Sequence, residues 1–219
     1  MRISRIRGRA CLVGLVLAGC GSDTGTTTLP ASGTAYRRLD DGQRTAVAEQ
    51  CRDRAADRAR GLAARELRAI DSAALRDRLD SAYSVIVEQR RPVAAVCREA
   101  IPFVTPGLRI AFDGAKDNRD GSFTIETSSD KRLTISGRVT PPPAGARVRA
   151  VREVGPSVAR SASVGVDGRF RLPAFRLRKV ADNTFTVAIH APPHAARKVL
   201  FTAICLDCLA GRPPPAPRR

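Results

Sequence analysis

The sequence predicts an α+β protein in which two to three helices precede an antiparallel β-sandwich of about seven to eight strands. Between residues 37 and 101, apolar residues recur at helical spacing, and from Gly107 onwards they alternate with polar residues. The alternating segments follow one another at roughly 8 to 15 residues and are separated by turn formers such as Asp120-Gly121 and Asp167-Gly168. Evenly spaced short strands are typical of a sandwich.

Composition divides the chain into five segments. A basic and then apolar start precedes a stretch rich in Gly, Ser and Thr, and a basic segment rich in proline closes the sequence. We therefore predict a signal peptide over 1–19, a lipidated flexible linker over 20–36, a helical region over 37–104, a β-sandwich over 105–209 and a disordered tail over 210–219.

The first segment has the order of a secretory signal. Four arginines and no acid stand among the first ten residues, and the apolar run after them is far shorter than the roughly 18 to 20 residues that span a bilayer. The run ends in Leu17-Ala18-Gly19-Cys20, which resembles the lipobox of bacterial lipoproteins at every position. The resemblance implies cleavage before Cys20 and a diacylglyceryl group on its thiol. Two acyl chains hold a protein firmly to a membrane, so we expect attachment to the extracytoplasmic face of the cell membrane.

Three starting points for helices stand out in the helical region. Asp40 or Asp41 can cap a first helix that runs to about Leu67, Asp71 is a good N-cap for a second, and Pro92 suits the first turn of a third. The inward positions expected on these helices are Val47, Cys51, Ala55, Leu62, Leu75, Leu79, Ala82, Tyr83, Ile86, Val93, Val96, Cys97 and Ala100.

The strand region is similar to bacterial immunoglobulin-like and carboxypeptidase-regulatory-like domains of cell-surface proteins. A strand containing Ser-Gly, a turn, an Ala-x-Val strand, an Asp-Gly-x-Phe hairpin and a closing strand carry the resemblance, in segments 133–140, 145–148, 166–172 and 183–189. The resemblance covers about 75 residues and implies a spacing, display or binding role. These domains have no common catalytic residues, so none is carried over.

The cysteines predict two disulfides. Cys11 leaves with the signal and Cys20 is lipidated, so four cysteines remain in an oxidising compartment. We favour Cys51–Cys97 and Cys205–Cys208, because the first pair falls on apolar helix faces and the second is close in sequence. The alternative links the helical region to the strand region through one cysteine of each pair.

Other chemistry is less well supported by the sequence. Cys205 and Cys208 have the spacing of a thiol–disulfide site, but the motif follows a strand instead of opening a helix that would lower a thiol pKa. The same cysteines with His190 and His194 supply zinc ligand types without a standard spacing. These two histidines are also the candidates for a general base near neutral pH. We therefore predict no catalytic residue, no metal and no cofactor.

The segment 117–121, Asp-Asn-Arg-Asp-Gly, hints at a calcium loop. Aligning Gly121 with the EF-hand glycine puts Lys116 at the first ligand position and Thr127 at the last, where an acidic side chain is needed. We therefore predict a hairpin turn here.

The chain is strongly basic. Its formal charge is +17, and +13 remains once the four arginines of the signal are removed. Such a surface attracts anionic lipid, acidic wall polymer or nucleic acid. With no Trp, two Tyr and seven Phe, the chain has few residues on which bases could stack, so we expect no nucleic-acid partner.

These observations together predict a non-enzymatic, membrane-anchored lipoprotein of the cell envelope with a binding or structural role. Its expected partners are the membrane, through the lipid, and an anionic wall polymer or another envelope protein. The alternatives are a thiol–disulfide redox or other envelope enzyme that uses Cys205 and Cys208, and an accessory subunit of an export or cell-wall complex.

Overall fold

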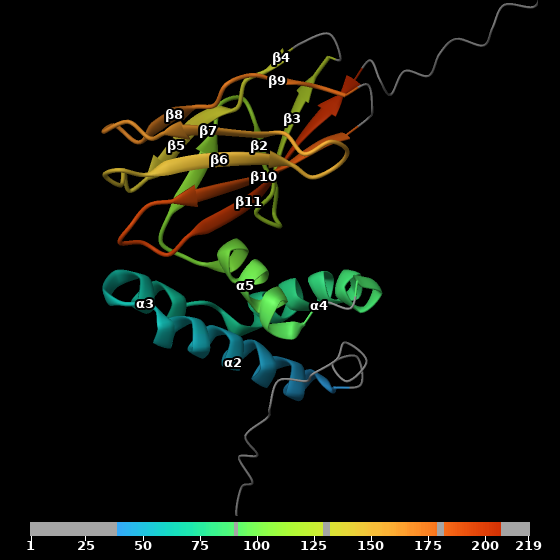
Figure 1. Cartoon of the computed structure of the whole chain (residues 1–219), viewed down its shortest axis with the longest axis vertical. Helices are drawn as coiled ribbons and strands as arrows, with labels where there is room; N and C mark the ends of the chain where they lie inside the picture. Colours follow the sequence, from blue (N-terminus) through green and yellow to red (C-terminus); the bar gives the residue numbers. More distant parts are fainter. Residues whose placement is uncertain (1–38, 90–91, 129–131, 179–181, 207–219) are drawn as a thin grey trace, which may run out of the picture.

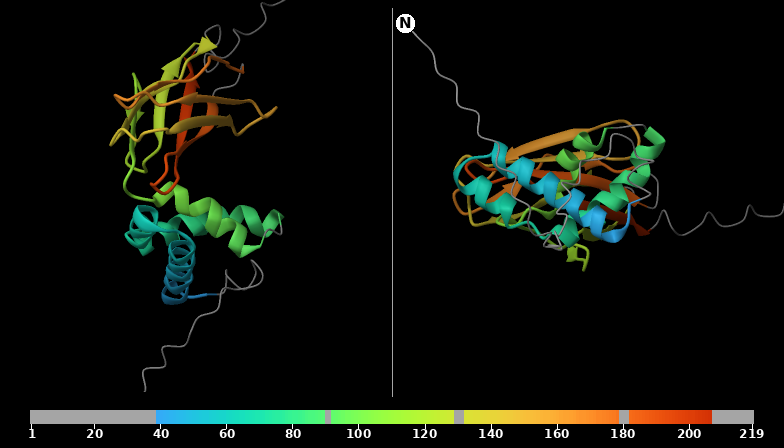
Figure 2. Two further views of the ribbon diagram at one scale, coloured as in Figure 1. Left: turned by 60° about the vertical axis from the view of Figure 1, so that its left-hand side comes forward. Right: turned by 90° about the horizontal axis from the view of Figure 1, so that it is seen from below.

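The computed structural model describes residues 39–89, 92–128, 132–178 and 182–206. The predicted signal peptide, linker and tail lie outside these residues, as do Cys20 and Cys208. Within these described ranges four helices precede a region of strands, so the α+β class is confirmed. The helices lie together at one end of the strands, with α5 (Val93–Val104) next to them (Figures 1 and 2). Among the described residues, no helix is long and apolar enough to cross a membrane.

The first predicted helix is two helices. α2 (Asp41–Arg58) begins at Asp40, whose side chain accepts the backbone N–H of Gln43 at 2.8 Å while the Gln43 side chain accepts that of Asp40 at 3.0 Å. The backbone is extended at residues 59 and 60, and Gly61 then adopts a φ of +57° at the start of α3 (Gly61–Arg68). This break ends the helix before Leu67, the predicted end, and lets α3 fold back against α2.

The other two helices begin where the sequence predicts. The Asp71 carboxylate accepts the backbone N–H of Ala73 at 2.9 Å at the start of α4 (Ser72–Gln89), and Pro92 immediately precedes α5. A disulfide joins Cys51 of α2 to Cys97 of α5. The core of the helical region contains Val47, Ala48, Cys51, Ala56, Leu67, Ile70, Leu75, Leu79, Val93, Val96, Cys97, Ala100 and Ile101, with Ala195 from the strand region.

Eleven strands form in the described residues, more than the seven to eight expected. They are β1 (Arg109–Phe112), β2 (Lys116–Asp117), β3 (Phe123–Thr127), β4 (Arg132–Leu133), β5 (Ser136–Thr140), β6 (Arg147–Arg152), β7 (Ala159–Ser163), β8 (Arg169–Arg171), β9 (Phe175–Arg176), β10 (Asp182–His190) and β11 (Arg197–Cys205). The sheets have the orders β1-β5-β8, β2-β3-β11-β10-β6-β7 and β4-β9.

Part of the difference in strand number comes from a bulge. The register passes from Ser136 opposite Arg171 to Leu133 opposite Phe175, so three residues of one chain segment face two of the other. Pro173, which cannot donate to a sheet, is one of the three. The β4–β9 pair therefore continues the β5–β8 ladder beyond a bulge.

One pair of strands is parallel, although the sequence predicted an antiparallel arrangement throughout. β3 pairs with β11 in parallel, with Phe123 opposite Phe201. The pattern of alternation predicts strands but not which distant strand each one joins. β11 therefore lies between β3 and its antiparallel neighbour β10.

The two larger sheets share one apolar core. The Phe112 ring of β1 lies with its centroid 4.8 Å from that of Phe123, 4.8 Å from that of Phe201 and 6.0 Å from that of Phe170, so it joins residues of both sheets. The fully buried side chains around it include Ile135, Val139, Val148, Leu172, Phe175, Phe185, Val187 and Ile189.

Candidate functional site

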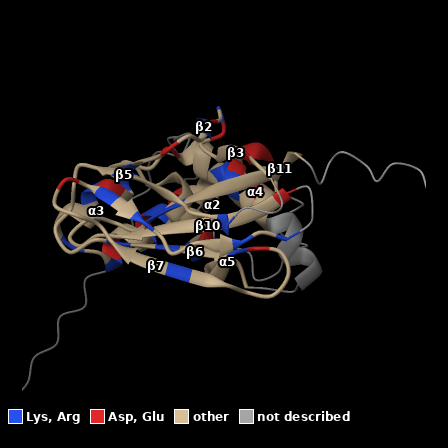
Figure 3. Ribbon diagram, turned by 90° about the horizontal axis from the view of Figure 1, so that it is seen from above, with Lys and Arg blue, Asp and Glu red and all other residues tan. Residues whose placement is uncertain are grey.

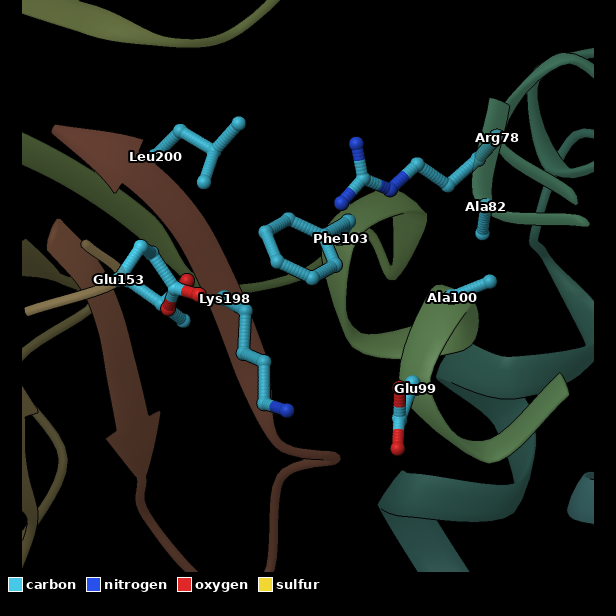
Figure 4. Close-up of a pocket in the computed structure, with 9 residues that line it drawn as sticks. Arg78, Ala82, Glu99, Ala100, Phe103, Glu153, Lys198 and Leu200 are labelled. Carbon is cyan, nitrogen blue, oxygen red and sulfur yellow. The ribbon is translucent and has the colours of Figure 1, made fainter. Parts of the chain in front are cut away.

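The junction between the helices and the six-stranded sheet holds the best candidate for a binding site. Phe103, near the end of α5, is half-buried between Arg78 of α4 and Lys198 of β11. The Arg78 guanidinium carbon lies 4.0 Å from the centroid of the Phe103 ring, and Lys198 Nζ lies 5.9 Å from it (Figure 4). Both distances are within the range of cation–π attraction.

Arg78 is incompletely paired in this position. Its Nε atom is buried and has no hydrogen-bond partner in the structure. Burial lowers the pKa of Arg78 from its ordinary value, because a desolvated guanidinium loses part of its hydration. A buried donor without an acceptor costs free energy, which an anionic or carbonyl ligand oxygen could offset.

Two cavities adjoin these side chains. The one drawn in Figure 4 has a volume of about 320 Å³ and a second one about 550 Å³, and both are lined by Arg78, Phe103, Lys198 and Leu200. Glu99 and Glu153 balance the two cations in the first cavity. The further lining residues of the second cavity include Asp77, Ser81, Arg119, Asp120 and Ser122. Apolar surface beside charges of both signs suits a ligand with an apolar body and polar ends.

His194, considered above as a zinc ligand and a general base, lies in the β10–β11 loop and contacts a buried carboxylate. Its Nδ1 atom lies 2.7 Å from Glu66 Oε1, and the other carboxylate oxygen accepts the backbone N–H of Ala195 at 2.8 Å. Glu66 is buried on α3, so these contacts tie the β10–β11 loop to the helices. Gly107 makes room for them, because it has a φ of +105° and a Cβ there would overlap the Glu66 carboxylate.

Of the zinc ligands considered from the sequence, Cys208 lies outside the described residues, and His190 and Cys205 are far apart. His190 is the last residue of β10, at the end of the strand that lies near the helices, and is opposite Arg147. Cys205 is the last residue of β11. Asp182, at the other end of β10, is opposite Ile204, so the length of a nine-residue strand, about 27 Å, separates His190 from Cys205. Within the described residues, no group of three or more His, Cys, Asp and Glu side chains could hold a metal ion.

Cys205 is buried and disulfide-bonded. Cys51 and Cys97 are paired with each other, so the partner of Cys205 lies outside the described residues. The Cys205–Cys208 pairing therefore stays a prediction.

The segment 117–121 forms the hairpin turn that the sequence predicts. β2 and β3 pair antiparallel on either side of it, with Asp117 opposite Phe123. The Asp120 carboxylate accepts hydrogen bonds from the Ser122 hydroxyl and backbone N–H, and these bonds lower the pKa of Asp120 below its ordinary value.

The sequence does not indicate which residues meet at the junction between the helices and the six-stranded sheet. In the sequence, Arg78 and Lys198 cannot be distinguished from basic residues that face solvent. Glu66 likewise lies among charged neighbours on its helix. Phe103 directly follows Pro102, a residue that is unusual inside a helix, but this neighbour does not indicate a binding role. The packing of α4 on α5 brings Arg78 to Phe103, and the packing of α5 on β11 brings Lys198 to it.

Comparison with known proteins adds little. No family model and no curated protein matches the chain. Among solved structures, one of murine CRIg is 13% identical and covers 46% of this chain and 98% of its own, with a TM-score of 0.30. At that level of similarity, we conclude nothing about fold or function from it.

Proposed function

We propose that this protein is a lipid-anchored lipoprotein of the bacterial cell envelope, held at the extracytoplasmic face of the membrane, and that it is a binding or structural protein and not an enzyme. The observation that carries the proposal is Leu17-Ala18-Gly19-Cys20 at the end of a short apolar run behind four arginines. The Cys51–Cys97 disulfide supports it, because disulfides persist in oxidising compartments outside the cytoplasm.

The proposal includes an immunoglobulin-like β-sandwich over 105–209 as the body that the anchor holds. One apolar core between the three-stranded and six-stranded sheets supports this architecture. The last helix ends at Val104 and the first strand begins at Arg109, which agrees with a boundary between these positions.

The binding role is supported by the junction. Arg78 offers a buried donor without an acceptor beside an open cavity, and the described residues that line this cavity include no cysteine or histidine. The lining places the Phe103 ring beside charges of both signs, which suits a ligand with an apolar body and polar ends.

Substitution of the lipidated residue tests the proposal. In the bacterial host, the wild-type chain should partition into the detergent phase of a phase-separation assay, and Cys20→Ser should move it to the aqueous or secreted fraction. Cys11→Ser is the matched control, because it removes a thiol from the segment that is cleaved off. The proposal fails if the Cys20→Ser protein stays in the detergent phase as the wild type does.

A further inference from the structure

The three-stranded sheet carries its charges on the face that points away from the core. Strands β1, β5 and β8, with the β4–β9 pair that continues them, contain six arginines and no acidic residue. All six arginines are exposed, whereas their neighbours along the strands are mostly buried. We call this surface the arginine face: Arg109, Arg132, Arg138, Arg169, Arg171 and Arg176.

Strand register places like charges against each other on this face. Arg138 is directly opposite Arg169, and Arg132 is directly opposite Arg176. Like charges directly opposite each other destabilise a sheet. An acidic partner would reduce this repulsion, which remains in the folded protein on its own. Basic residues also lie along β6 and β7 of the other sheet (Figure 3).

Among the residues that the structure describes, nearby acidic groups compensate little of this charge. The Asp113 carboxylate accepts the Ser136 hydroxyl at 2.7 Å, and Asp167 is 3.5 Å from Arg169 in an exposed pair of the kind that contributes little. A hollow of about 330 Å³ is lined by Ser136, Arg169 and Arg171 together with Asp113, so two guanidinium groups and one carboxylate meet whatever enters it.

We propose that the arginine face binds a linear acidic polymer with repeated phosphodiester groups, an inference that rests on the proposed binding role at the envelope and names the partner. Residues on this face lie about 5 Å apart across strands and about 7 Å apart along a strand. Arg132 is six residues from Arg138, about 20 Å away. The arginine face is therefore longer than one small anion, and its length matches a polymer that carries several phosphate groups. One guanidinium group can donate two parallel hydrogen bonds to two oxygens of a phosphate, whereas a lysine ammonium group cannot.

The polymer is favoured over the membrane itself by the path of the chain. The described residues begin next to α2, in the helical region, while the strand region extends away from these helices (Figures 1 and 2). An anchor that precedes α2 attaches the chain on its helical side, so a flexible linker leaves the arginine face of the strand region free to meet a polymer.

The test measures binding of the mature chain to fluorescently labelled poly(glycerol phosphate) by anisotropy. Arg138→Gln/Arg171→Gln should raise the Kd at least tenfold and reduce the slope of log K against log salt concentration by about two, one for each lost phosphate contact. The control Arg147→Gln/Arg149→Gln removes the same charge from an exposed position of β6 in the other sheet and should change the Kd less than twofold. Far-ultraviolet circular dichroism and urea midpoints equal to the wild type establish that both variants are folded.

Three outcomes would overturn the inference. Equal losses in the two double variants would mean that overall charge attracts the polymer. Phosphatidylglycerol vesicles or duplex DNA bound more tightly than the polymer, at equal phosphate concentration, would identify a different partner. A wild-type chain that does not bind the polymer at all would end the inference, while the detergent-phase result for Cys20→Ser would stand or fall separately.

Discussion

The Nδ1 atom of His194 lies 2.7 Å from Glu66 Oε1, although 128 residues separate the two in sequence. Together with the hydrogen bond from Ala195, this contact fixes the β10–β11 loop on the helical region. A second link lies beside it, since Arg197 Nη1 donates to the Thr105 carbonyl oxygen at 2.5 Å just after α5. Helices and strands are thus joined by directional polar contacts as well as by the packing of α5 against β11.

Glu66→Ala should lower the free energy of unfolding by about 3 kcal/mol. The substitution leaves the Ala195 N–H and the His194 ring without their acceptor in a buried place, and such orphaned groups cost about 1–3 kcal/mol each. Urea unfolding measures the change. Glu49→Ala, which alters an exposed acid on α2, is the control and should stay within about 0.5 kcal/mol of the wild type. Equal effects of the two substitutions would show that the carboxylate of Glu66 does not support the junction.

Gly107→Ala should destabilise the protein by about 1–3 kcal/mol, because it forces an alanine into a left-handed conformation against the Glu66 carboxylate. Gly145→Ala is a matched control: its φ is also positive, at +68°, but its new Cβ would meet nothing within 4 Å. It should therefore cost less, about 1 kcal/mol. In a Glu66→Ala background the cost of Gly107→Ala should fall toward that of the control, and an unchanged cost would rule out the steric conflict.

Removal of the Cys51–Cys97 disulfide should cost about 4 kcal/mol. The bond closes a loop with a sequence separation of 46, which gives this value in the chain-entropy model. The measurement compares the wild type with Cys51→Ser/Cys97→Ser in urea without reductant, so that the bond at Cys205 stays intact in both. A double variant as stable as the wild type would show that the helical region does not need its cross-link.

Arg78→Met should leave the free energy of unfolding unchanged or raise it by up to about 2.5 kcal/mol. The variant loses a cation–π contact worth about 0.5–1 kcal/mol but also removes a buried N–H without an acceptor, which costs about 1–3 kcal/mol. Phe103→Ala, which empties the same junction of apolar contacts, should destabilise. A clear loss of stability in Arg78→Met would mean that the arginine serves packing and not a ligand.

The sequence predicted the features that depend on near neighbours. Asp40 and Asp71 begin helices because their side chains accept N–H groups two or three residues ahead, and a pattern of that length can be read directly. The apolar stripe that places Cys51 and Cys97 on inward helix faces is equally local. The Asp120-Gly121 turn follows from its own residue types.

Features set by distant contacts were missed. No proline marks the break before Gly61. The extended backbone at residues 59 and 60 is stabilised by the packing of α3 on α2. The parallel register of β3 with β11 depends on which strand edge is free in the folded sheet. Arg78 meets Phe103 only after α4 and α5 have packed, so no spacing in the sequence encodes their contact.

The position of β11 has a consequence for how the chain reaches its folded state. Of the described strands this one is made last, yet it lies inside the six-stranded sheet, between β3 and β10. Until β11 has been made, the edges of β3 and β10 that it will cover have unpaired backbone N–H and C=O groups. Such edges can pair with strands of other chains. The six-stranded sheet therefore cannot be completed until β11 is available, and a chain exported before it folds would assemble this sheet only after β11 has crossed.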